Sequence, residues 1–180
     1  SFDMAFIAGF TASNKLFGLL EIAAMSYGFA ITTYVGQNYG AMRFDRIRSG
    51  MKSATVLALA TSLVIAALMF LFGRPITGLF ISSENPLEAA QAGNIAYTYL
   101  CVMASALPIL YMLYLYMFAL QGLGDTVTSM ISGFVELFLR IAVAITIAVT
   151  GYELGIMAAE PVAWIGCTIY LGYHYRKKMK

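Results

Sequence analysis

Residues 53–72 read SATVLALATSLVIAALMFLF, a run of apolar and small residues that contains no charged side chain. The hydrocarbon core of a bilayer is about 30 Å thick, and a helix needs about 20 predominantly apolar residues to cross it. This stretch therefore predicts a helix that spans a membrane.

The composition of the whole chain has the same character. Of its 180 residues, 61% are hydrophobic and only 11% are charged, and the mean hydropathy is +0.79. A soluble domain carries about 25% charged residues, so this chain has less than half the usual share. The composition excludes a soluble globular enzyme, a disordered chain and a nucleic-acid-binding domain, and it predicts an integral membrane protein.

Five segments are long and apolar enough to be candidate spans, so the expected fold is an all-α polytopic membrane helical bundle with five transmembrane helices. Turn-forming residues (glycine, asparagine, serine, proline and aspartate) separate the segments. The start at Ser1 lacks the features of a signal peptide, and we expect the chain to be an interior piece of a longer protein. The predicted spans are 10–35, 53–72, 95–120, 127–149 and 154–173.

The basic residues are distributed unequally between the two predicted sides of the membrane. Eight lie in the loop after the first span and in the C-terminal tail, whereas only Arg74 follows the second span. The positive-inside rule therefore places the side with more basic residues, and the C-terminus, in the cytoplasm. The membrane is then expected to be the inner membrane of a bacterial cell. The eight residues are Arg43, Arg46, Arg48, Lys52, Arg176, Lys177, Lys178 and Lys180.

Several charged residues lie inside the predicted spans, where each costs about 2.5–3.5 kcal/mol at the bilayer centre. At a rise of about 1.5 Å per residue, Glu21, Arg140 and Glu160 fall in one layer roughly 20 Å from the cytoplasmic ends of their spans. Glu136 lies about one turn nearer the cytoplasm, and Lys15 lies near the outer end of the first span. Such residues are expected to face the bundle interior or a water-filled cavity.

Glu136 and Arg140 are four residues apart on one helix, with the acid first, which favours an ion pair. The pair is either a structural bridge or a proton- or cation-responsive carboxylate whose pKa depends on the arginine. Glu21 and Glu160 need a partner of opposite charge from another helix, for which Arg140 and Lys15 are the candidates. Glu160 alternatively caps a bend at the proline that follows it.

The third span combines a proline with many tyrosines. Pro108 predicts a bend that is either a static kink or a hinge beside a cavity. Tyrosine and methionine surfaces suit flat cationic ligands, although aromatic residues are also frequent at membrane interfaces. Tyr111 is the candidate contact for a ligand in a group that also includes Tyr97, Tyr99, Tyr114 and Tyr116.

No enzyme motif is found in the sequence, and the remaining reactive residues have ordinary interpretations. Cys101 and Cys167 lie in apolar runs without metal-ligand spacing, so we interpret them as buried apolar residues. His174 beside the basic tail is interpreted as interfacial. The sequence contains no zinc-protease helix, nucleotide-binding loop or serine nucleophile elbow, so we expect neither an enzyme nor a cofactor.

Several motifs, which occur in the order of the family, resemble the multidrug and toxic compound extrusion (MATE) family. TYVGQNYGA at 33–41, followed by RFDRIR at 43–48, is similar to the segment after the second helix of each lobe. LQGLGDT at 120–126 resembles the end of a lobe's fourth helix. Glu136 with Arg140, and EPVAW at 160–164, resemble the last two helices of the C-terminal lobe, and Asn14 with Lys15 matches a polar-basic pair at the outer end of the eighth helix.

The resemblance implies helices eight to twelve, the C-terminal lobe, of an antiporter built from two six-helix lobes. Such a protein exports organic cations and other drugs in exchange for Na⁺ or H⁺, and its N-terminal lobe is missing from this chain. Glu136 is then the first candidate for ion exchange, including Na⁺ binding, with Arg140 tuning it. The alternatives are a flippase for lipid-linked oligosaccharides of the same superfamily and a membrane scaffold that transports nothing.

Overall fold

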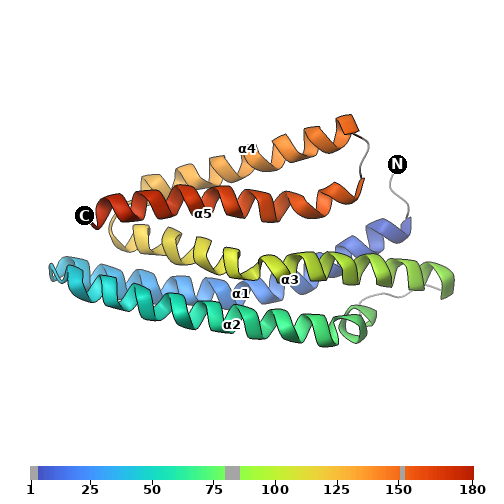
Figure 1. Ribbon diagram of the computed structural model, residues 1–180, viewed down its shortest axis with the longest axis horizontal. Helices are drawn as coiled ribbons and strands as arrows, with labels where there is room; N and C mark the ends of the chain where they lie inside the picture. Colours follow the sequence, from blue (N-terminus) through green and yellow to red (C-terminus); the bar gives the residue numbers. More distant parts are fainter. Residues whose placement is uncertain (1–3, 80–85, 151–152) are drawn as a thin grey trace.

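The computed structural model describes residues 4–79, 86–150 and 153–180, and helices make up nearly all of these ranges. The helices lie side by side along the long axis of one elongated bundle (Figure 1), which confirms the all-α fold. They are α1 (Met4–Gly40), α2 (Phe44–Gly78), α3 (Pro86–Gly122), α4 (Thr126–Thr150), the 3-10 helix η1 (Glu153–Ala158) and α5 (Ala159–Lys178).

The helices α1 to α4 are long and apolar enough to cross a membrane, as four of the five predicted spans require. The chain is therefore a multi-pass membrane protein. The helices extend beyond the predicted spans; α2, for example, begins at Phe44 rather than Ser53. Hydropathy marks only the part of a helix that lipid surrounds, whereas the hydrogen-bonded helix continues through the polar residues beyond it.

The fifth predicted span, 154–173, has a different structure at its start. Residues Glu153–Ala158 form η1, and α5 begins only at Ala159. Helix α5 carries Glu160 in its first turn and three basic residues in its last, and it is not among the described helices that are apolar enough to cross. Its passage through the membrane therefore stays a prediction.

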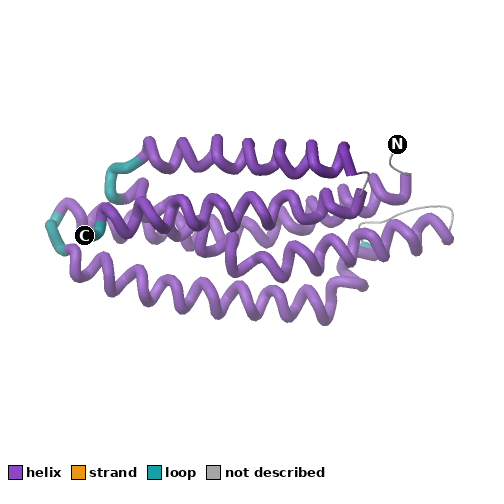
Figure 2. Tube along the Cα trace, turned by 45° about the horizontal axis from the view of Figure 1, so that its top comes forward, coloured by secondary structure: helices purple, strands orange, loops and turns teal. Residues whose placement is uncertain are grey.

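The two short turns and the C-terminus lie at the same end of the bundle (Figures 1 and 2). The first turn joins α1 to α2, and the second joins α3 to α4 through Gly124, whose φ of +77° is a conformation that glycine adopts without strain. This arrangement places the basic loop and the basic tail together, as the predicted topology requires. The cytoplasmic location of this end stays a prediction.

Helix α3 occupies the centre and packs against α1, α2 and α5. Its backbone approaches α1 closely at two hydroxyl contacts: Ser13 Oγ donates to the Ala96 carbonyl at 2.8 Å, and Thr32 Oγ1 donates to the Phe118 carbonyl at 3.1 Å. Small and hydroxyl residues allow such approaches between membrane helices. By contrast, α4 packs mainly against α5 and is otherwise largely exposed.

Candidate functional site

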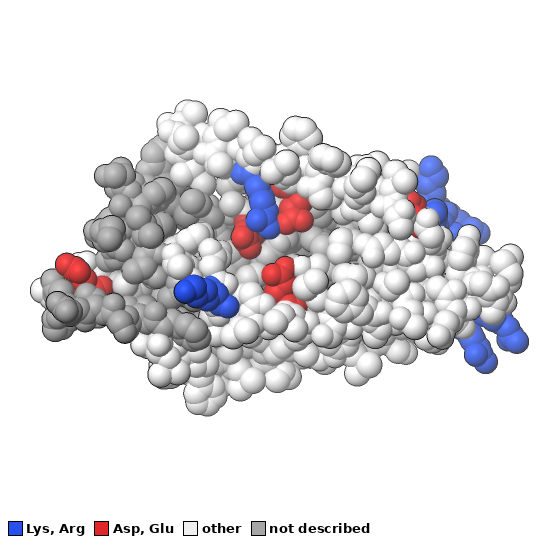
Figure 3. Space-filling model, turned by 180° about the vertical axis from the view of Figure 1, so that it is seen from behind, with Lys and Arg blue, Asp and Glu red and all other residues white. Residues whose placement is uncertain are grey.

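A cavity of about 530 Å³ lies between α1, α3, α4 and α5, and all the acidic residues predicted inside the spans line it. In Figure 3, acidic and basic side chains gather near the middle of a face whose other charged side chains lie towards its two ends. The arrangement agrees with the expectation that intramembrane charges face a cavity. The lining consists of Asn14, Phe17, Gly18, Glu21, Leu110, Leu113, Tyr114, Met117, Glu136, Arg140, Glu160 and Trp164.

Helix α4 supplies the predicted ion pair. The Nη2 atom of Arg140 lies 2.6 Å from Oε1 of Glu136, one helical turn earlier. This distance is typical of a strong charge-assisted hydrogen bond. The pair is partly accessible, with 29% of the Glu136 side chain and 40% of the Arg140 side chain exposed.

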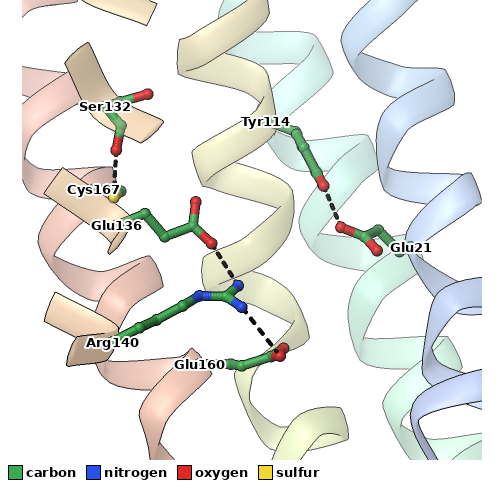
Figure 4. A network of polar contacts seen from close by, with 7 residues as sticks. All are labelled: Glu21, Tyr114, Ser132, Glu136, Arg140, Glu160 and Cys167. Carbon is green, nitrogen blue, oxygen red and sulfur yellow. Dashed lines mark hydrogen bonds and ion pairs between the residues drawn. The ribbon is translucent and has the colours of Figure 1, made fainter. Parts of the chain in front are cut away.

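Glu160 reaches the same guanidinium from the first turn of α5. Its Oε1 lies 3.4 Å from Arg140 Nη1, so one arginine bridges two carboxylates on neighbouring helices (Figure 4). Glu160 thus has Arg140 as its partner, as one of the two interpretations expected, and its role at the bend before Pro161 stays a prediction. The Arg140 Nε atom is buried and has no hydrogen-bond partner among the described residues.

Glu21 has a different kind of partner from the one expected. Its carboxylate accepts a short hydrogen bond from the hydroxyl of Tyr114 on α3 (Figure 4). Among the described residues it forms no ion pair with Arg140 or Lys15. The expectation that only a cation on another helix could serve was therefore wrong, because a phenol can donate a hydrogen bond to a carboxylate without carrying charge.

The apolar and neutral residues complete the cavity wall. Phe17 and Trp164 stack with ring centroids 5.4 Å apart, which joins α1 to α5 beside the charges. Asn14 accepts a hydrogen bond from the hydroxyl of Tyr99 at 3.0 Å, and this bond holds the amide at the cavity. The aromatic wall provides the kind of flat, electron-rich surface that attracts cations.

The cavity has an excess of acidic groups. Three carboxylates, those of Glu21, Glu136 and Glu160, face one guanidinium, that of Arg140, so the fully ionised lining has two more negative than positive charges. An uncompensated charge in a membrane protein is costly. A proton, a metal cation or an organic cation would each lower that cost by entering the cavity.

Three of the predicted site residues lie outside this lining. Lys15 is exposed on α1. Tyr111 is buried on α3, where its ring lies 5.7 Å from that of Tyr27 and its hydroxyl has no hydrogen-bond partner in the described part of the chain. Pro108 is partly buried within α3. Cys167 is buried as expected, and its Sγ lies 3.4 Å from the Ser132 carbonyl between α5 and α4.

Tyr114, Phe17 and Trp164 are the aromatic residues of the cavity lining, and sequence reasoning did not select them as site residues. Tyr114 belonged to the tyrosine group of the third span, yet nothing in its spacing distinguished it from Tyr111. The two tyrosines are three residues apart and project only about 60° from each other around a helix of 3.6 residues per turn. The packing of α1 and α4 decides which of them faces the charges.

A multi-pass helical bundle with a charged cavity among its helices defines a class of membrane protein whose function lies within the bilayer. The chain belongs to the MatE family, whose model matches residues 2–146. The chain is 32% identical over 90 residues to "Probable multidrug resistance protein NorM" of Bacillus subtilis (strain 168); the match covers 50% of the chain and 20% of that protein.

A second relative in the same organism is "Probable multidrug resistance protein YoeA", which is 25% identical over 84 residues. This match covers 47% of the chain and 18% of YoeA. The chain therefore aligns with only about a fifth of the length of each of these curated relatives. No solved structure is a significant match.

Proposed function

We propose that this chain is part of a cation-coupled antiporter that exports organic cations or similar drugs, rather than an enzyme. The observation that carries the proposal is the excess of two carboxylates over cations in the cavity between α1, α3, α4 and α5. Membership of the MatE family and the names of the two relatives support the transport role. The coupling ion is Na⁺ or H⁺.

In this proposal Glu136 exchanges its partner during transport. When Arg140 moves away from it, the carboxylate becomes available to a proton or to Na⁺, and Glu160 then holds the guanidinium by itself. Binding of the ion neutralises the acid and weakens its hold on the arginine. The arrival of a cationic substrate against the same acids would therefore favour release of the ion, as an antiporter requires.

Glu21 and Tyr114 form the substrate side of the cavity in the same proposal. Their hydrogen bond joins α1 to α3 across from the Arg140 cluster. A cation between the two sides would contact Glu21 and the Phe17–Trp164 stack. Alternating access would then follow from the movement of this lobe against the N-terminal lobe, which lies outside this chain.

The proposal is tested by ethidium efflux from vesicles that contain the full-length protein, driven in turn by an imposed Na⁺ gradient and by an imposed pH gradient. We expect efflux under one of the gradients, and that gradient identifies the coupling ion. Replacing Glu136 with glutamine should reduce the coupled rate at least about tenfold, the size expected when one partner of a charged pair is lost. The matched control is Asp45→Asn, at an exposed acid in the first turn of α2 outside the cavity.

Normal coupled efflux by Glu136→Gln at equal expression would contradict the assigned role of this residue. Absence of efflux under both gradients, with folded and inserted protein, would contradict the antiporter itself. That result would favour a lipid-linked or metabolite substrate. A flippase for pyrophosphate-linked lipids is the weaker candidate, because Arg140 is the one cation in a predominantly acidic cavity lining.

A further inference from the structure

A second cavity lies at the end of the bundle that carries the short turns and the C-terminus. It has a volume of about 640 Å³ and lies between α2, α3 and α5. Its charged lining consists of Arg48, Lys52 and Arg176, with no acidic residue among them. The charge is therefore opposite to that of the acidic cavity described above.

The three cations are not neutralised by neighbouring acids. The ion pairs in the described part of the chain involve Arg140 and Lys178, and none involves these three residues. Arg48 is fixed at the cavity by its Nη2 atom, which donates to the Met179 carbonyl at 2.5 Å. That contact leaves its other donors and its full charge available to an anion.

The remainder of this cavity is largely apolar and continues onto the exposed apolar surface of α2. The rings of Tyr116 and Tyr175 lie with their centroids 5.6 Å apart in its wall. Val56, one turn along α2 from Lys52, is 67% exposed, and the exposed Leu63 and Val64 follow further along the helix. The basic end of the cavity is thus directly adjacent to an apolar surface on α2.

We propose that this cavity binds an anionic phospholipid, with the headgroup phosphate at Arg48, Lys52 and Arg176 and the acyl chains along α2. Basic pockets between membrane helices suit such headgroups, because cations near the membrane surface attract anionic lipids. Arginine also binds a phosphate through two parallel hydrogen bonds. A free inorganic phosphate has the same headgroup chemistry but would gain nothing from the apolar surface of α2.

The test is native mass spectrometry of the full-length protein, freed of lipid in detergent and titrated with three probes. They are phosphatidylglycerol, phosphatidylcholine with the same acyl chains, and inorganic phosphate. We expect phosphatidylglycerol to bind at least about tenfold more tightly than phosphatidylcholine, and inorganic phosphate at millimolar concentration not to displace it. Displacement by phosphate, or equal binding of the two lipids, would overturn the proposal.

The double variant Lys52→Gln with Arg176→Gln locates the site. Both side chains are exposed and neither forms a described ion pair, so this variant should fold. It should weaken phosphatidylglycerol binding about tenfold. The control Arg43→Gln with Lys177→Gln removes the same charge from exposed positions at the same end, outside the cavity, and should change binding less than twofold.

Equal losses in the two double variants would overturn the proposal, because the attraction would then come from the general charge of this end. Arg48→Gln adds an independent measurement. It should weaken phosphatidylglycerol binding without changing phosphatidylcholine binding. A merely structural loss of the Arg48–Met179 contact would reduce the binding of both lipids equally.

Discussion

Helices α3 and α4 are neighbours in the chain, yet they differ in how much of their surface is packed against the rest of the bundle. Half of the residues in the most apolar part of α3 are buried within the bundle, compared with 6% for α4. Helix α3 has neighbours on three sides, namely α1, α2 and α5, whereas α4 rests mainly on α5. In the described bundle, α3 is therefore the structural centre and α4 is a peripheral helix with one packed face.

The difference in burial shows that different contacts fix the positions of the two helices. The position of α3 depends on close backbone approaches and on dense apolar packing around residues such as Leu107 and Leu110. The position of α4 depends on fewer contacts, and the bridge from Arg140 to Glu160 is one of them. Charged contacts that hold a weakly packed helix can also be changed by an ion, so the structural contacts of Arg140 and its proposed role in ion exchange involve the same groups.

The largest effect is expected from Arg140→Met, which removes the bridge from α4 to Glu160 on α5. The variant leaves Glu136 and Glu160 without their counter-charge, and we expect a loss of about 3 kcal/mol of stability, at the low end for a broken buried pair because the side chains are partly exposed. The same substitution at Arg74, an exposed arginine 4.8 Å above the Tyr97 ring, serves as the control and should cost less than about 1 kcal/mol. Denaturant unfolding of the protein in detergent measures both.

A double variant distinguishes a structural pair from a site that must stay charged. Adding Glu136→Gln to Arg140→Met removes one of the two uncompensated carboxylates, so part of the lost stability should return. Transport should not return, because the proposed exchange of an ion for arginine needs both groups. Recovery of transport together with stability would mean that Glu136 and Arg140 form only a structural bridge.

Hydropathy and charge patterns predicted the apolar helices α1 to α4 and the two described turns, at the ends of α1 and α3. Those features depend on the free energy of moving each side chain from water into the bilayer. Each residue contributes to it separately, so a single sequence is enough to predict them. The common depth of Arg140 and Glu160 anticipated their contact for this reason. Depth alone could not show that the two helices are adjacent, which depends on how α4 rests on α5.

Hydropathy and charge patterns could not predict the hydrogen-bond partner of Glu21. Its contact with Tyr114 depends on the rotation of α3 relative to α1, and a change of about 60° would present Tyr111 instead. That rotation is set by packing of many small contacts, including Ser13 on Ala96 and Thr32 on Phe118. No single residue type in the sequence signals it.

The packing difference between the two helices is tested by one substitution at two glycines. A Cβ atom at Gly122, at the end of α3, would lie 2.8 Å from the Thr32 carbonyl oxygen, whereas at Gly133 on α4 it would meet nothing within 4 Å. Gly122→Ala should therefore destabilise the protein by about 1–3 kcal/mol through overpacking. Gly133→Ala should be neutral or slightly stabilising, since alanine is the better helix former.

Unfolding of the two alanine variants in the same detergent makes the comparison quantitative. The measured quantity is the difference in unfolding free energy between each variant and the parent. Equal effects at the two positions would mean that α4 is packed as tightly as α3. That result would remove the basis for treating α4 as a weakly held helix.

The smallest expected effect concerns Asp125, which anchors the start of α4 outside the apolar spans. Its Oδ1 accepts a hydrogen bond from the Thr128 backbone N–H at 3.1 Å, and its Oδ2 lies 3.1 Å from Lys178 Nζ at the end of α5. Burial by itself raises the pKa of Asp125, but the bonds from Thr128 and Lys178 outweigh it and lower this pKa below its ordinary value of 3.8. The carboxylate therefore stabilises the folded protein above about pH 4, and this contribution is lost as the pH falls through the lower, folded pKa.

Two substitutions separate the two contacts of Asp125. Asp125→Asn keeps an N-terminal cap but loses the ion pair, and should cost less than about 1 kcal/mol because Lys178 is 42% exposed. Asp125→Ala loses the cap as well and should cost about 1 kcal/mol more. Thermal unfolding measured from pH 6 to pH 3 should show a smaller acid-induced decrease in both variants than in the parent. An unchanged decrease in Asp125→Asn would assign the acid sensitivity to other carboxylates, and α4 would then depend on the Arg140 bridge more than on its own first turn.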